Sequence, residues 1–177
     1  MSSAIVIRPL EPPDQHLVRA AEGWVELGLT GEAEAELTQV RPETRAHPQY
    51  LHAIWAVHAA RQEWSLAHAA AEAIIQITPE EVNGWVHRAY AARRMEGGGL
   101  HKAWDALRPA AELFPGETIV PYNLACYACQ MGNLDAARHW LSRAKAVAGK
   151  HGGAETFKQM ALADPDLAPL HASVRDW

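Results

Sequence analysis

The sequence has few of the features that mark several large protein classes. Only two of its 177 residues are cysteines, Cys126 and Cys129, and they lie too close together to join distant parts of the chain. No run of about 18 apolar residues occurs, so no membrane span is expected. Residues 1–13 have neither a basic start nor a long apolar stretch, so no signal peptide is expected either. These features predict a cytoplasmic protein that does not associate with membranes.

Basic residues are also scarce. There are 16 lysines and arginines against 21 aspartates and glutamates, and the formal net charge of -5 argues against general nucleic-acid binding. The charge is uneven, because residues 1–46 have eight acidic and four basic side chains whereas residues 80–108 have four and five. Aromatic residues make up only 7% and apolar residues 49%, much of it alanine, which is typical of helices packed through small side chains.

Patterns of catalytic and metal sites are missing as well. None of the ten histidines forms an HxxxH or HExxH pattern, and Gly97-Gly98-Gly99 lacks the Gly-Lys-Ser/Thr of a phosphate loop. Cys126 and Cys129 form a CxxC in the middle of an expected helix with no preceding strand, which favours packing residues over a thiol redox site. We therefore expect no enzyme activity, no cofactor and no metal. A thiol-dependent redox protein is the least favoured alternative.

The chain does contain a repeat of 34 to 36 residues. Each repeat has an expected first helix, helix A, and a second, helix B. Corresponding positions of helix B are spaced by 36 and then 34 residues, and they are Trp64, Leu100 and Leu134; Ala67, Ala103 and Ala137; Ala71, Leu107 and Leu141; and Ile74, Ala110 and Ala144. In helix A the order is reversed, 34 and then 36, as for Trp55, Ala89 and Ala125. Two extra residues therefore lie between the helices of the middle repeat, where Gly97-Gly98-Gly99 predicts a loop.

These residues resemble the tetratricopeptide repeat (TPR) family of bacterial type. Its repeat has a large apolar residue and then a small one in helix A, glycine at the turn and alanine in helix B. The last repeat matches this pattern best, with Leu124, Ala125, Gly132, Leu134, Ala137, Leu141 and Ala144. The earlier repeats depart from it at Trp55, where a small residue is usual, and at Arg88, where leucine is usual.

The resemblance implies an all-α fold, an αα superhelix of three to four helical hairpins with a C-terminal capping helix. We expect an extended arm over residues 1–13 and a single helical domain over 14–177. Its expected parts are a degenerate hairpin at 14–45 with its turn at Thr30-Gly31, repeats at 46–79, 80–117 and 118–149, a loop at 149–153 and a cap at 154–177.

The resemblance also implies a binding surface, because TPR proteins generally bind a peptide or a helix along the groove made by helix A. The groove candidates are Gln49, His52, Ala56, Asn83, Val86, Tyr90, Arg93, Arg94, Tyr122, Asn123, Cys126 and Gln130. Arg93 and Arg94 beside Tyr90 and Tyr122 would form a basic ledge suited to an acidic segment. An equally weighted interpretation is that both arginines only solvate a helix end.

The function expected from these features is a non-enzymatic scaffold or adaptor that binds a peptide or protein in this groove. A dedicated assembly or secretion chaperone is the alternative, because small proteins of three repeats resemble that class in size. Self-association through an edge of the helix stack is a further hypothesis about partners.

Overall fold

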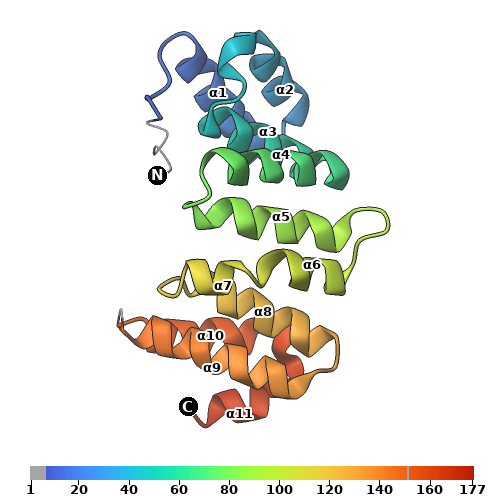
Figure 1. Cartoon of the computed structure of the whole chain (residues 1–177), viewed down its shortest axis with the longest axis vertical. Helices are drawn as coiled ribbons and strands as arrows, with labels where there is room; N and C mark the ends of the chain where they lie inside the picture. Colours follow the sequence, from blue (N-terminus) through green and yellow to red (C-terminus); the bar gives the residue numbers. More distant parts are fainter. Residues whose placement is uncertain (1–6, 151) are drawn as a thin grey trace, which may run out of the picture. The chain divides into compact units, whose positions relative to one another are not determined.

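The computed structural model describes residues 7–150 and 152–177, and all regular secondary structure in them is helical (Figure 1). This confirms the predicted all-α class. No helix within these residues is long and apolar enough to cross a bilayer. The helices form two compact units, Met1–Gly97 and Gly98–Trp177, whose boundary lies in the loop predicted at Gly97-Gly98-Gly99. This boundary falls inside the expected repeat 80–117, and the single domain over 14–177 stays a prediction.

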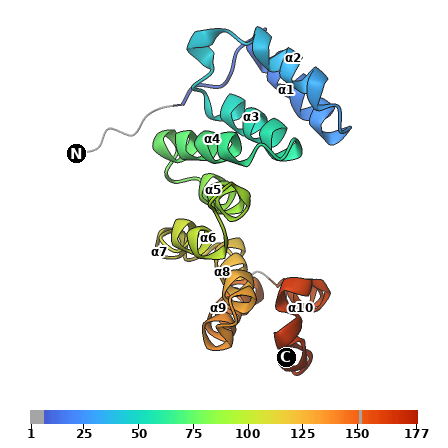
Figure 2. The same ribbon diagram turned by 90° about the vertical axis from the view of Figure 1, so that its right-hand side faces the viewer.

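Unit 1 is a series of antiparallel helices (Figure 2). It contains α1 (Asp14–Glu26), α2 (Thr30–Gln39), a 3-10 turn η1 (Pro42–Thr44), α3 (Pro48–Ala60), α4 (Trp64–Ile77) and α5 (Val82–Arg94). Helix α1 packs on α2 and α3, α3 packs on α4, and α4 packs on α5. Small side chains that are fully buried, such as Ala21, Ala33 and Ala67, allow this close packing.

Three hairpins of the chain share one turn geometry. Gly28 between α1 and α2 and Gly132 between α8 and α9 have φ of 75° and 77°, in the left-handed region that glycine adopts without steric cost. Gln62 holds the same place between α3 and α4 with φ of 60°. In each turn the following residue donates its backbone N–H five residues back, at 2.8 to 2.9 Å. The turn expected at Thr30-Gly31 was therefore wrong, because Gly28 makes the turn and α2 already begins at Thr30.

The buried carboxylate of Asp14 ties α1 to η1. It accepts hydrogen bonds from the Arg41 backbone N–H at 3.3 Å and from Arg41 Nε at 2.9 Å. A hydrogen bond from the Thr44 side chain, with those from Arg41, lowers the pKa of Asp14 below its usual value despite burial. A lowered pKa means that this contribution to stability is present above the usual carboxyl pKa and is lost progressively as the pH falls below it through the lowered value.

Helices α4 and α5 are in close contact at Gly84. A Cβ atom at this position would lie 2.9 Å from Ile74 Cγ2 and 3.1 Å from Ile75 Cγ1. Since Ile74 is fully buried, it has no free volume into which to move. The close spacing of α4 and α5 thus depends on Gly84 having no side chain.

Unit 2 is built around one helix. Its elements are α6 (Leu100–Leu107), α7 (Ala110–Leu113), α8 (Ile119–Gln130), α9 (Leu134–Lys150), α10 (Ala154–Ala163), a 3-10 segment η2 (Pro165–Leu170) and α11 (His171–Arg175). Helix α8 packs on α6, α7, α9 and η2, and it is buried on nearly all sides from Val120 to Cys129. The expected second helix of the middle repeat is divided into α6 and α7 just before Pro109, because proline cannot donate a backbone hydrogen bond.

The ends of the chain differ from expectation in two respects. Residues 7–13 of the expected arm contain no helix, and residues 1–6 lie outside the described range. The loop expected at 149–153 begins later, because α9 continues through Lys150. The C-terminal cap comprises α10, η2 and α11, and Leu167, Leu170 and Val174 are buried within unit 2.

Candidate functional site

The predicted groove residues are divided between the two units. In unit 1 they lie on α3 (Gln49, His52 and Ala56) and on α5 (Asn83, Val86, Tyr90, Arg93 and Arg94). The structure brings the two helices together through aromatic side chains.

The contact between α3 and α5 is a row of four rings. Trp55 stacks on His87 with ring centroids 3.7 Å apart and an interplanar angle of 8°. His52 meets His87 edge-on at 5.4 Å, and Tyr90 meets Trp55 edge-on at 6.3 Å. On each helix the two residues are three positions apart, which places them on one face. Two predicted groove residues, His52 and Tyr90, are thus joined through Trp55 and His87. Neither of these two was among the predicted groove residues.

The Trp55 and His87 stack contains two buried polar atoms. Trp55 Nε1 and His87 Nδ1 have no hydrogen-bond partner among the described residues. Burial, with a smaller effect from the nearby His52, lowers the pKa of His87 to about 4. His87 is therefore neutral at pH 7, and protonating it in the folded state is unfavourable.

We expect acidification from pH 7 to pH 5 to destabilise unit 1 through His87. In the unfolded chain histidine takes up a proton near pH 6.5, whereas folded His87 does so only near pH 4, so the unfolded state binds more protons between these values. Stability is then complete above about pH 6.5 and falls by about 1 to 2 kcal/mol at pH 5. Urea unfolding across this range, compared with His87→Gln, measures the effect. An equal loss in the variant would assign it to other groups.

Arg94 lies at the end of the aromatic row. Its guanidinium carbon is 3.4 Å from the centroid of the Tyr90 ring and 5.4 Å from that of Trp64. Its Nη1 donates to the Tyr90 carbonyl oxygen at 3.1 Å. Among the described residues Arg94 has no ion pair with a carboxylate. This cation is therefore held on an aromatic platform and not neutralised.

The stacked Arg94 borders an open hollow of about 520 Å³. We call it the Arg94 hollow, and its lining is Ala59, Ala60, Gln62, Trp64, Tyr90 and Arg94. Two of the predicted groove residues, Tyr90 and Arg94, lie together at this hollow. Gln62 and Trp64 are not among the predicted groove residues, because no local pattern signals that a turn between α3 and α4 meets the end of α5.

The other predicted residues of unit 1 surround this row. Gln49 and Asn83 are exposed, whereas Val86 and Arg93 are partly buried. His52 Nε2 lies 3.3 Å from Glu81 Oε2, which adds an acidic group at the start of α5. The face formed by α3 and α5 therefore has the His52–Glu81 pair at one end and the cation of Arg94 at the other.

In unit 2 the predicted groove face of α8 is covered by the chain's own C-terminal cap. Tyr122 donates its hydroxyl to Asp164 Oδ2 at 2.5 Å, and Cys126 Sγ lies 3.6 Å from the same oxygen. Gln130 Nε2 donates to the Asp166 carbonyl oxygen at 3.3 Å. These three residues share one face at spacings of four, whereas the partly buried Asn123 bonds to the Ile119 carbonyl oxygen. Tyr122 and Cys126 are thus buried and do not line an open surface.

The two cysteines have the environment of packing residues. Both are free and buried, and burial, followed by the nearby Asp164 and Asp166 charges, raises the pKa of the Cys126 thiol. The pKa of Cys129 is raised for the same reasons. Redox-active cysteines need a lowered pKa, so this environment disfavours thiolate chemistry. No group of three or more His, Cys, Asp or Glu side chains in the described chain is placed to hold a metal ion.

A second hollow, of about 500 Å³, lies in unit 2 beside Trp140. Arg143 stacks over the Trp140 ring at 5.3 Å and lies 3.6 Å from Glu112 Oε1. Its Nη2 also donates to the Ala111 carbonyl oxygen. Because Arg143 already has these partners, it is not an unpaired charge comparable to Arg94.

Comparisons with known proteins identify relatives in fold. No protein-family model matches the chain, and no curated protein does. The MamA RS-1 ArsTM double mutant superposes with a TM-score of 0.67 at 17% identity, over 80% of this chain and 79% of that one. The MamA MSR-1 C2 structure gives 0.63 at 17% identity, over 78% of both chains. A thermophilic TPR protein from Thermus thermophilus, TTC0263, gives 0.63 at 18% identity, over 93% of this chain and all of that one.

Proposed function

Because the chain has the fold of tetratricopeptide repeat proteins, we propose that it is a non-enzymatic interaction scaffold that binds a peptide or protein partner. The binding face is formed by α3 and α5, and its partner is an acidic segment. The observation that carries this proposal is Arg94, an unpaired cation held on Tyr90 at the end of a row of aromatic side chains. Such platforms combine a large contact area with a charge that needs an anion.

Two features support unit 1 as the place of binding. The corresponding face of α8 already holds Asp164 and Asp166 of the chain itself, through Tyr122, Cys126 and Gln130. That contact is an intramolecular example of an acidic segment lying on the first helix of a hairpin. Displacing it would expose Leu167 and Leu170, which are buried, so it is better explained as a permanent cap than as a gate.

The two free thiols suit the cytoplasmic location expected from the sequence.

We expect peptides selected by the wild-type chain from a random displayed library to be acidic. Changing Arg93 and Arg94 together to alanine should weaken their binding by about 10-fold to 100-fold, since hydrogen bonds to charged groups contribute about 1.5 to 3 kcal/mol. Titration by fluorescence anisotropy gives the dissociation constants. Arg138→Ala on α9 is the control, because it removes an exposed arginine whose ion pair is with the exposed Asp135 of the same helix. Failure to select any peptide, or equal binding by the double variant, would refute the proposal.

A further inference from the structure

We propose that the Arg94 hollow is a carboxylate site, and that Gln62 occupies its unfavourable backbone conformation because its side chain belongs to that site. The ligand group is the side-chain carboxylate of an aspartate or glutamate in the partner. This inference rests on the proposed function, and it identifies the residues that bind the acidic group. Arg94 supplies the positive charge, and Gln62 beside it is the residue that determines specificity.

The backbone supplies the first argument. Gly28 and Gly132 take the left-handed conformation in the corresponding turns, and glycine does so without strain. Gln62 takes it at φ of 60°, where a side chain costs stability because Cβ crowds the backbone. Strain of this kind persists where the surrounding structure enforces it, and it is frequent at binding sites. A glycine would therefore suit the fold better than Gln62 does.

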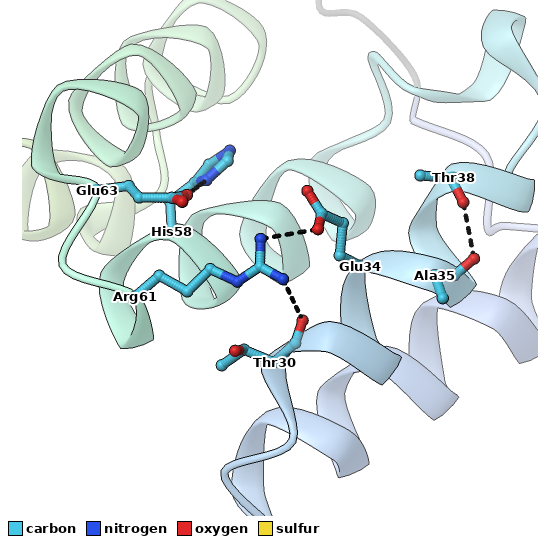
Figure 3. A network of polar contacts seen from close by, with 7 residues as sticks. All are labelled: Thr30, Glu34, Ala35, Thr38, His58, Arg61 and Glu63. Carbon is cyan, nitrogen blue, oxygen red and sulfur yellow. Dashed lines mark hydrogen bonds and ion pairs between the residues drawn. The ribbon is translucent and has the colours of Figure 1, made fainter.

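The two neighbours of Gln62 in the chain, Arg61 and Glu63, hold this turn through polar contacts. Figure 3 shows these two side chains and their partners. Arg61 Nη1 is 2.8 Å from Glu34 Oε2, and Arg61 Nη2 donates to the Thr30 carbonyl oxygen at 3.0 Å. On the other side, His58 Nδ1 lies 2.6 Å from Glu63 Oε2. Both neighbours of Gln62 are thus engaged, whereas its side-chain amide makes no hydrogen bond among the described residues. The exposed amide is available to a ligand in the hollow that it lines.

The charge and shape of the hollow select a carboxylate. Its lining includes one cation, Arg94, and no acidic side chain. Because the guanidinium lies over the Tyr90 ring, one of its faces is covered, and the N–H groups that do not bond to the Tyr90 carbonyl oxygen are left for a ligand. A planar carboxylate matches the guanidinium with two parallel hydrogen bonds, and the Gln62 amide adds a further donor. Trp64 and Tyr90 form apolar walls of the hollow, against which the carbon atoms of the acidic side chain can pack.

The test uses the full chain and a small probe, N-acetylglutamate α-amide, with N-acetylglutamine α-amide as its neutral counterpart. Binding is followed by NMR through the Trp64 indole N–H and the Arg94 Nε–H. We expect saturable shifts at millimolar concentration with the acidic probe and none with the neutral one. Arg94→Gln should abolish them, whereas Arg19→Gln, which changes the same charge at an exposed position of α1, should leave them unchanged.

Gln62→Gly gives the decisive result because its two effects have opposite sign. We expect a higher urea midpoint, from release of backbone strain, together with at least threefold weaker binding of the acidic probe. A higher midpoint with unchanged binding would overturn the role of Gln62, and so would a midpoint that does not rise. Absence of acidic-probe shifts in the wild-type chain, or tighter binding of inorganic phosphate than of the acidic probe, would overturn the carboxylate assignment.

This test and that of the proposed function fail separately. If the probe binds as described but no displayed peptide is selected, the carboxylate site stands and the scaffold function does not. If acidic peptides bind and the probe leaves Trp64 and Arg94 unshifted, the scaffold function stands and the Arg94 hollow is not its acid-reading site.

Discussion

Replacing Asp164 by alanine is expected to lower the free energy of unfolding by about 2 to 4 kcal/mol. The carboxylate accepts the Tyr122 hydroxyl at 2.5 Å and caps η2 by accepting the Asp166 backbone N–H at 2.8 Å. Its loss leaves a buried hydroxyl without a partner, which costs about 1 to 3 kcal/mol, and removes a cap that contributes about 0.5 to 2 kcal/mol. Chemical denaturation followed by circular dichroism measures the change.

The same substitution should also increase the reactivity of Cys126. Its thiol is buried and its pKa is raised, so a thiol reagent should modify it slowly in the wild-type chain. Loosening η2 from α8 opens this side of the helix, and the rate should rise. Asp176→Ala serves as the control because Asp176 is exposed beyond the end of α11. Equal stability of the Asp164 and Asp176 variants would show that the cap is held by its apolar contacts alone.

Replacing Gly84 by valine should destabilise unit 1 by about 2 to 3 kcal/mol, near the upper end of the range for overpacked cores. The new Cβ would already lie 2.9 Å from Ile74 Cγ2, so α4 and α5 must separate to admit the remaining methyl groups. Thermal and urea unfolding of the full chain measure the loss.

Gly23→Val is the matched control for this prediction. Gly23 also lies within a helix, but no atom is within 4 Å of the position that its Cβ would take. Valine there removes the helix penalty of glycine and should leave stability unchanged or slightly higher. If both valine variants lost stability equally, close packing of α4 and α5 would not be the cause.

The spacing at Gly84 also bears on the Arg94 hollow. Trp64 is the first residue of α4, whereas Tyr90 and Arg94 lie in the second half of α5. Separation of the two helices would move Trp64 away from the guanidinium that it now approaches at 5.4 Å. The site thus depends on a helix contact that includes none of its own residues.

Helical periodicity allowed much of the architecture to be predicted from the sequence. The alanines at 67, 103 and 137 mark positions that are fully buried, and Gly132 marks a turn that needs positive φ. Each of these signals is local, because a backbone angle or a helical face depends on residues within a few positions. For the same reason, the class, the repeat and the loop at Gly97-Gly98-Gly99 were predicted correctly.

Local signals failed where packing between distant segments decided the outcome. Arg94 and Tyr90 were recognised together because they share one helix, but Gln62 joins them only through the contact of α4 with α5. Tyr122 and Cys126 have the positions of groove residues on α8, yet a segment about 40 residues later covers them.

The sequence by itself therefore determined the helical repeat and which face of each helix is apolar, since both follow from spacing along one helix. Only the tertiary structure decided which polar faces stay open, where Gln62 is strained and what covers α8. Those outcomes depend on side-chain volumes and hydrogen bonds between segments far apart in the chain, which no local pattern records.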